Sequence, residues 1–325
     1  MTTAASPAQL ERELEGYRRE LTGYCYRMLG SAFDAEDAVQ ETLVRAWRGL
    51  ERFEGRAALK SWLYKIATNV CLDVLNSKER RIRPLELGAP GGLDSALTTR
   101  PETSWLEPIP DGQVLSPDGD PAQLAEERDT LRLAFVAALQ HLPPQQRAVL
   151  IFREVLRWRA NEVAELLETS VASVNSALQR ARASLDATEL TPSEPLKPLD
   201  EEQQELLQRY VKAFEDYDMD AITALLHEDA KQSMPPYEMW LLGRESILSW
   251  WMGPGAGCRG SRLIPVVANG LPAFGQYRPS GPGGAHEPWA LQVLEISDGR
   301  IAGFTAFLDT ERLFPLFGLP LTPPE

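Results

Sequence analysis

The stretch WRANEVAELLETSVASVNSALQRARASL, residues 158–185, decides the fold of its part of the chain. Apolar residues recur at helical spacing on both sides of a short break: Val163, Ala164 and Leu167 before it, and Val171, Val174 and Leu178 after it. Ser170 suits the N-cap of the second helix, because its hydroxyl can accept a hydrogen bond from a first-turn amide. The pattern predicts a helix-turn-helix, a motif whose second helix lies in the major groove of DNA.

The polar side of that second helix carries short residues and two arginines, which suit base edges and phosphates but equally suit solvent. These residues are Ser173, Asn175, Ser176, Gln179, Arg180 and Arg182. Upstream, helical spacing begins at Leu124 and stops at Leu142-Pro143-Pro144, where Pro144 fits the first turn of another helix. Residues 124–190 therefore form one all-α domain.

Residues 1–84 predict a second all-α domain, made of three amphipathic helices. The first carries apolar residues from Leu10 to Met28 and ends near Gly30, and the second begins with Asp34 as its N-cap. Val39, Leu43, Trp47 and Leu50 lie along one side of the second helix. The third runs from about Leu59 to Arg80 and ends in a basic cluster.

Two linkers are indicated by composition. Residues 85–123 are rich in proline and show no sustained hydrophobic period, and residues 85–130 hold ten Asp or Glu against two Lys or Arg. This composition predicts a solvated acidic spacer. A shorter proline-containing linker occupies residues 191–200.

Residues 201–325 differ in character and predict an α+β domain. A helix is expected over Glu201–Glu215 and a short one over Asp220–Leu226, where His227 would close the helix. Four β-rich runs follow, and SDG at 297–299 predicts a hairpin between the last two. Large apolar side chains in this domain fit a core or a pocket: Tyr237, Trp240, Trp250, Trp251, Phe274, Trp289 and Phe304.

Composition excludes several classes of protein. The 325 residues are 43% hydrophobic and 25% charged, as in folded proteins, and no run reaches the roughly 18 apolar residues of a membrane span. Because the N-terminus also lacks a signal-peptide pattern, we expect a cytoplasmic protein with no membrane partner. Three cysteines without a CxxC pair and three dispersed histidines indicate no disulfide framework, no metal site and no cofactor.

Taken together, the motifs resemble those of a known family. DAEDAVQETLVRAW, WLYKIATNVCLDVL and ERR within residues 10–83 resemble domain two of the extracytoplasmic-function sigma factors of bacterial RNA polymerase. HLPPQQRAVLIF and the helix-turn-helix resemble their domain four, and residues 201–319 resemble the SnoaL-like cone fused to some members. The resemblance implies two helical DNA-binding modules, a C-terminal cone, and promoter-specific initiation with core RNA polymerase and promoter DNA as partners.

The resemblance also implies roles for individual residues. The core-polymerase surface would hold Asp34, Asp37, Gln40 and Glu41. Contacts to the minus-ten element would come from the FEGRAALKSW loop and from Lys60, Trp62, Lys65, Asn69, Arg80 and Arg81. The polar face of the helix-turn-helix would read the minus-thirty-five element, although Glu168 stands where the family usually has a turn glycine. In related factors the acidic linker threads through the polymerase cleft.

Alternatives remain at this point. The acidic residues around Asp34 equally cap and solvate a helix, and Trp62 equally fits a core. The cone could regulate the helical domains, with an unknown small ligand or regulatory protein as its partner, or it could be an enzyme or small-molecule sensor. We expect no catalysis, because neither His227 nor His286 has an identifiable carboxylate partner. A conventional repressor would bind operator DNA tightly without polymerase, which a net charge of -14 disfavours.

Overall fold

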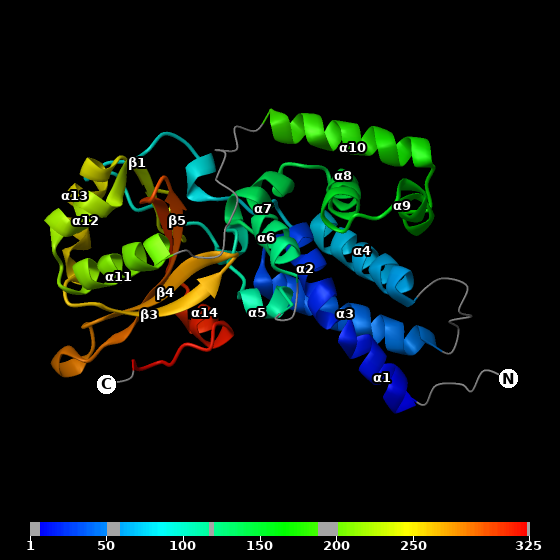
Figure 1. The fold of residues 1–325 in the computed structure, drawn as a ribbon, viewed down its shortest axis with the longest axis horizontal. Helices are drawn as coiled ribbons and strands as arrows, with labels where there is room; N and C mark the ends of the chain where they lie inside the picture. Colours follow the sequence, from blue (N-terminus) through cyan, green and yellow to red (C-terminus); the bar gives the residue numbers. More distant parts are fainter. Residues whose placement is uncertain (1–6, 51–58, 117–119, 188–200, 324–325) are drawn as a thin grey trace. The chain divides into compact units, whose positions relative to one another are not determined.

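The computed structural model describes residues 7–50, 59–116, 120–187 and 201–323. They form two compact units: the described parts of Met1–Arg81 and Leu106–Thr191, here called the helical unit, and those of Ile82–Trp105 and Pro192–Glu325, here called the sheet unit. Figure 1 shows helices in the first unit and a sheet with covering helices in the second, which confirms the predicted fold class. Every helix in the described ranges is too short or too polar to cross a lipid bilayer.

The helical unit is built from short amphipathic helices. They are α1 (Pro7–Gly16), α2 (Arg18–Leu29), α3 (Ala32–Gly49), α4 (Leu59–Ser77), α5 (Asp111–Val114), α6 (Pro121–Asp129), α7 (Leu133–Gln140), α8 (Pro144–Leu150), a π-helical turn (Ile151–Val155), α9 (Ala160–Leu166) and α10 (Val171–Asp186). Gly30 ends α2 in the left-handed conformation at φ 71°, as predicted. Pro144 opens α8, also as predicted.

Several predicted boundaries are wrong. The single first helix is two helices, divided at Tyr17. Ser31, not Asp34, is the N-cap of α3, because its Oγ accepts a hydrogen bond from the Asp34 amide at 3.0 Å. The helical signal from Leu124 belongs to two helices, α6 and α7, and α6 begins at Pro121. The linker 191–200 and the FEGR turn at 53–56 lie outside the described residues.

An aromatic cluster joins the segments predicted as domains two and four into one unit. Tyr24 of α2 and Tyr64 of α4 pack against Phe152, with ring centres 5.0 and 5.8 Å from it, and Trp158 closes the cluster. Tyr24, Tyr64 and Phe152 are fully buried. Because aromatic pairs bury large areas, this cluster stabilises the close arrangement of the two predicted domains.

Two buried arginines add hydrogen bonds across the same junction. Arg147 of α8 donates to the Met28 carbonyl and to Gln140 Oε1, the latter at 2.6 Å. Arg27 of α2 donates to Thr130 Oγ1 at 2.7 Å. Burial lowers the pKa of each guanidinium to about 10. Both remain charged at neutral pH, so their carbonyl and hydroxyl partners compensate for lost hydration.

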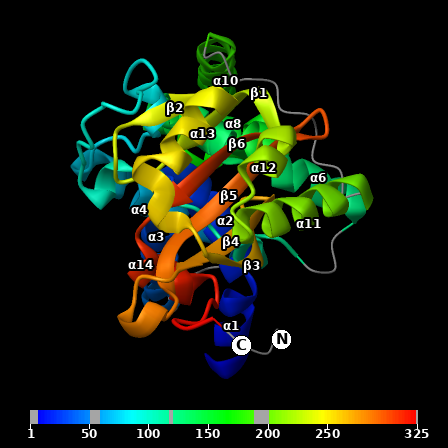
Figure 2. The same ribbon diagram turned by 90° about the vertical axis from the view of Figure 1, so that its left-hand side faces the viewer.

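The sheet unit contains one mixed sheet within its described residues. Its strands are β1 (Leu226–Ser233), β2 (Trp240–Leu242), β3 (Arg262–Ala268), β4 (Leu271–Arg278), β5 (Glu287–Ser297) and β6 (Arg300–Phe307), in the order β2-β1-β6-β5-β4-β3. Only the β1–β6 pair is parallel. The helices are α11 (Glu201–Glu215), α12 (Met219–Leu225), α13 (Arg244–Met252) and α14 (Thr310–Leu316). Figure 2 shows α11 and α12 lying across the sheet, where their apolar residues join its core.

The α+β prediction is confirmed in its helices and in its last four strands. Asp298 and Gly299 take positive φ values of 52° and 67° in the β5–β6 turn, as a tight hairpin with Asp-Gly requires. Strands β1 and β2 and helices α13 and α14 were not predicted, and the expectation that His227 closes a helix is wrong. His227 lies in β1, where its Nδ1 accepts a hydrogen bond from the Asp229 amide at 3.1 Å.

Residues 82–105, here called the connector, do not form the solvated spacer that composition predicted. The connector is part of the sheet unit and pairs with the rest of it, here also called the C-terminal domain, through a β-bridge between Thr99 and Tyr237. Its Arg100 amide donates to the Pro236 carbonyl at 3.1 Å, and its Gly91 amide donates to the Trp240 carbonyl at 2.7 Å. These contacts use backbone atoms, so they leave no periodic side-chain signal in the sequence.

Candidate nucleic-acid and polymerase interface

The helix-turn-helix is formed by α9 and α10. Ser170 caps α10 as predicted, with its Oγ accepting from the Ser173 amide at 3.1 Å. Val174 and Leu178 face the core, but Val171 is 43% exposed, so its predicted core position is wrong. Asn175 and Gln179 are exposed. Arg180 donates to Ser176 Oγ at 2.7 Å and Arg182 pairs with Glu154 at 2.6 Å, so α10 offers a polar, partly preorganised face.

Glu168 stands at the position of the expected turn glycine and adopts a left-handed backbone conformation. Its φ of 52° lies in the left-handed region, which a glycine adopts at lower cost. Its carboxylate lies 2.5 Å from the Lys65 ammonium of α4, and this hydrogen bond lowers the pKa of Glu168. The turn of the helix-turn-helix thus contacts the helix predicted to read the minus-ten element.

The two predicted promoter-reading surfaces line one cavity of about 600 Å³. Lys65 and Asn69 reach it from α4, and Ser173 and Arg180 reach it from α10. The minus-ten and minus-thirty-five positions lie roughly 25 base pairs apart, or about 85 Å of B-DNA. If α4 and α10 read these two elements, as the resemblance implies, they cannot do so while lining one cavity, and this arrangement of the helical unit is here called closed.

The other residues predicted to contact the minus-ten element have intramolecular partners. Lys60 pairs with Glu20 at 2.5 Å, and Arg80 Nη1 donates to the His141 ring at 2.6 Å. Trp62 is half-buried and packs against Gly49. Arg81 is only 6% exposed and bonds to Asp34 Oδ2 at 2.7 Å. In this closed arrangement Arg81 is part of an internal network rather than of a phosphate-binding surface.

Asp34 differs from the other residues predicted to bind core polymerase. It accepts hydrogen bonds from Lys78 at 2.7 Å and from Arg81. Burial raises its pKa, but the charges and hydrogen bonds of Arg81 and Lys78 outweigh this, so the pKa falls below its ordinary value. Asp37, Gln40 and Glu41 are exposed on α3. The structure therefore keeps three of the four side chains accessible to a partner.

The same helix exposes two apolar residues that the sequence analysis assigned no polymerase role. Trp47 is 64% exposed and Val44 is 41% exposed. Trp47 was expected on the apolar side with Val39, which its exposure shows to be wrong; eight residues along the helix place it about 80° around the axis from Val39, at the edge of the buried stripe. Asp37, Gln40, Glu41, Val44 and Trp47 are here called the α3 face.

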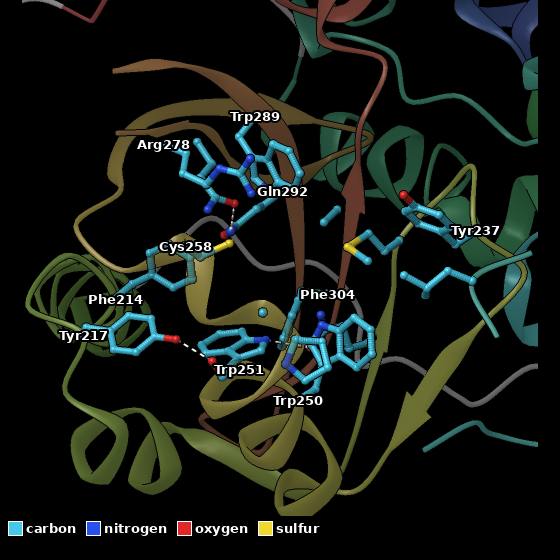
Figure 3. A pocket seen from close by; sticks show the side chains of 17 residues that line it. Phe214, Tyr217, Tyr237, Trp250, Trp251, Cys258, Arg278, Trp289, Gln292 and Phe304 are labelled. Carbon is cyan, nitrogen blue, oxygen red and sulfur yellow. Dashed lines mark hydrogen bonds between the residues drawn. The ribbon is translucent and has the colours of Figure 1, made fainter. Parts of the chain in front are cut away.

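The sheet unit contains a separate cavity of about 200 Å³. Among the predicted pocket residues, its lining includes Tyr237, Trp250, Trp251, Trp289 and Phe304. Phe274 lies in the core cluster outside this lining, and Trp240 instead donates its Nε1 hydrogen to the Gly88 carbonyl of the connector at 3.0 Å. Figure 3 shows Arg278, Gln292 and Cys258 gathered on one side of the cavity, with Trp250, Trp251 and Phe304 on another.

The polar part of this cavity was not predicted from the sequence. Gln232, Gln276 and Gln292 line it from three strands, with Arg278 and Cys258 beside them. An isolated glutamine within an apolar strand was the available signal, because a buried amide needs partners. The partners are present: Tyr210 donates to Gln292 Oε1 at 2.7 Å, and Gln292 donates to Gln276 Oε1 at 2.8 Å.

Comparisons with known proteins agree with this division of the chain. Residues 14–81 match the Sigma-70 region 2 model, residues 132–185 match the Sigma-70 region 4 model, and residues 207–304 match the SnoaL-like domain model. The two helical regions and the cone thus define the class: a sigma factor with a fused SnoaL-like domain.

The relatives identify the group within that class. The ECF RNA polymerase sigma factor SigG of Mycobacterium tuberculosis (strain ATCC 25618 / H37Rv) is 47% identical over 310 residues, covering 94% of this chain and 82% of the relative. SigJ of the same strain is 26% identical over 308 residues, covering 89% and 88%. The crystal structure of M. tuberculosis SigJ matches with a TM-score of 0.60 at 22% identity, covering 96% of this chain and 99% of that one. The chain belongs to the ECF RNA polymerase sigma factors.

Proposed function

We propose that this protein binds core RNA polymerase through the α3 face and directs initiation at promoters read by α4 and α10. The family match is the main support for this proposal. The exposed Trp47 and the polar face of α10 are the surfaces that we assign to polymerase and to DNA, respectively. Lys65, Asn69 and Arg180 are the residues we assign to promoter DNA. Lys60, Trp62 and Arg80 lie outside the lining of that cavity and have intramolecular partners in the free chain, and we assign Arg81 a structural role in holding Asp34.

The closed helical unit makes initiation depend on opening. Asn69 and Arg180 share one cavity, and the Lys65–Glu168 pair lies at its rim. This pair is exposed, and exposed ion pairs contribute only about 0.2–1 kcal/mol. Opening therefore has to overcome mainly the aromatic cluster and the buried arginines. Binding energy from core polymerase would supply the shift, since a partner favours the state for which it has higher affinity.

We also propose that the C-terminal domain limits activity by retaining the connector. Besides its backbone hydrogen bonds, the connector is held by an ion pair between Arg100 and Glu238 at 2.5 Å and by the Trp240–Gly88 hydrogen bond. A connector docked on the sheet unit is unavailable to thread through polymerase. The domain thereby sets the fraction of molecules competent for initiation.

A catalytic role for the sheet unit has less support. The described residues that line the cavity of about 200 Å³ include no Asp, Glu or His, whereas Glu215 and Asp216 line a separate hollow beside α11. Burial raises the pKa of the Cys258 thiol and the pKa of the Tyr217 hydroxyl, which makes the neutral form of each more dominant at pH 7. A cavity of this composition suits binding better than proton transfer.

Releasing the connector should increase transcription. We expect the Trp240→Phe, Arg100→Ala double variant to transcribe about 5- to 30-fold more than the parent at limiting core polymerase, because it loses one hydrogen bond and one ion pair worth about 1–2 kcal/mol together. Run-off transcription with purified core polymerase and a selected promoter measures this. Lys212→Ala, which removes the exposed Lys212–Asp216 pair elsewhere in the sheet unit, is the matched control.

Chains ending at Leu199 should show increased activity as well. Equal activity and equal start sites for the parent, the double variant and the shortened chain would remove the regulatory claim and leave initiation intact. A parent chain that initiates nowhere on a promoter library would remove the sigma-factor assignment itself.

A further inference from the structure

The sheet-unit cavity has the size and the walls of a small-ligand site. Its volume is about 200 Å³, and a cavity of about 150 Å³ can hold benzene. Phe214, Trp250, Trp251 and Phe304 supply aromatic walls, and the Trp251 and Phe304 ring centres lie 5.4 Å apart. A ligand of one or two fused rings fits these dimensions better than a flexible chain does.

The amides in the cavity are already held by the protein. Gln276 donates to Ser261 Oγ at 3.0 Å while its own Oε1 accepts from Gln292, and Gln232 Oε1 accepts from Trp251 Nε1 at 2.9 Å. These hydrogen bonds fix the orientation of each amide. The side-chain oxygens of Gln232, Gln276 and Gln292 each already accept a hydrogen bond from the protein. The amides therefore shape the polar side of the cavity, and they leave charge recognition to another residue.

Arg278 is the one charged side chain among the described residues that line the cavity. Its guanidinium carbon lies 3.5 Å from the centre of the Trp289 ring, and stacking of this kind orients the planar group. No ion pair between Arg278 and a carboxylate is found within the described chain, and Figure 3 shows Arg278 on the same side of the cavity as Gln292 and Cys258. An oriented guanidinium without a carboxylate partner suits a two-oxygen anion.

The connector contributes to the same cavity. Leu97 lines it and is 44% exposed, and the next residues, Thr98 to Arg100, bond to the segment from Pro236 to Glu238. A bound ligand would thus touch Leu97 only while the connector is docked. By linkage, a ligand that gains contacts in the docked state must stabilise that state.

We propose that this cavity binds a small aromatic carboxylate, with its ring against Trp251 and Phe304 and its carboxylate on Arg278, and that the ligand holds the connector in place. The regulatory half of this statement rests on the function proposed above, in which the docked connector limits initiation. The binding half depends only on the cavity.

Isothermal titration calorimetry of the full chain tests the binding half. The probe is 2-naphthoate, and 2-naphthamide is its uncharged counterpart with the same ring. We expect 2-naphthoate to bind at least tenfold more tightly than 2-naphthamide, and Arg278→Gln to remove that difference while leaving the binding of the amide unchanged. Arg209→Gln, which neutralises an exposed arginine on α11, is the matched control and should bind like the parent.

Hydrogen exchange followed by mass spectrometry tests the connector. Amides of Gly91 and Arg100 donate to the sheet unit, so saturating 2-naphthoate should slow their exchange several-fold. Leu97→Ala is at a partly exposed position where misfolding is not expected, and it should weaken both the binding and the protection. Neither experiment contains polymerase, so their results are independent of whether the chain initiates transcription.

Three results would overturn the proposal. They are no binding of 2-naphthoate at millimolar concentration, equal affinity of the parent and Arg278→Gln for 2-naphthoate, and tight binding without any change in connector exchange. The first two remove the site, and the third removes its coupling to the connector.

Discussion

Replacing Trp47 with alanine is expected to weaken binding to core RNA polymerase by roughly 30-fold, equivalent to about 2 kcal/mol. Trp47 is 64% exposed in the free chain, and it shares the α3 face with Asp37, Gln40 and Glu41. A large exposed indole beside polar and acidic residues is typical of an interface anchor, because it buries apolar area while the rim stays hydrated.

Fluorescence anisotropy of labelled chain titrated with core polymerase measures the effect of Trp47→Ala. Met252→Ala is the matched control, because Met252 is 61% exposed but lies in the sheet unit. We expect the control to bind like the parent. An unchanged affinity for Trp47→Ala would move the polymerase-binding surface away from α3.

Replacing Arg180 with alanine is expected to reduce initiation by about 5- to 150-fold at a promoter with an intact minus-thirty-five element, because a good bidentate base contact contributes about 1–3 kcal/mol. Arg180 is exposed on α10, and its guanidinium is steadied by Ser176 Oγ at 2.7 Å. Steadying reduces the entropy that the side chain loses when it meets a base edge.

The comparison of two promoters shows whether Arg180 reads a base or a phosphate. If Arg180 reads a base, the Arg180→Ala variant should initiate equally well at promoters with an intact and with a substituted minus-thirty-five element. If Arg180 contacts a phosphate, the variant should lose the same fraction of its activity at every promoter. Arg209→Ala removes an exposed arginine from α11 and controls for net charge. If the Arg180→Ala variant still distinguishes intact from substituted minus-thirty-five elements as well as the parent does, other residues of α10 read the element.

Local signals predicted much of the fold. Ser170 caps α10, Gly30 ends α2 and Asp298-Gly299 turns the last hairpin, because each of these positions has a requirement that few residues meet. Glu168 takes the left-handed conformation that a glycine adopts at lower cost, so the turn forms here without a glycine. Such features depend on neighbours within a few residues.

The remaining features depend on contacts distant in sequence. The connector docks through the amides of Gly91 and Arg100, and backbone amides are present in every sequence. The burial of Arg81 follows from Asp34 and Glu107, which lie 47 and 26 positions away along the chain. The facing of Asn69 and Arg180 follows from the packing of Tyr24, Tyr64 and Phe152. Periodicity within one helix carries no information about these pairings.

We infer that the two surfaces assigned to promoter DNA face each other in the free chain and must separate for initiation. The most direct measurement joins Lys65→Cys to Glu168→Cys with a reducible crosslinker in a Cys258→Ser background, in which the remaining cysteines, Cys25 and Cys71, are buried. We predict that the crosslinked chain fails to initiate with core polymerase and that reduction restores initiation. A crosslinked chain that initiates as well as the reduced chain would contradict the account.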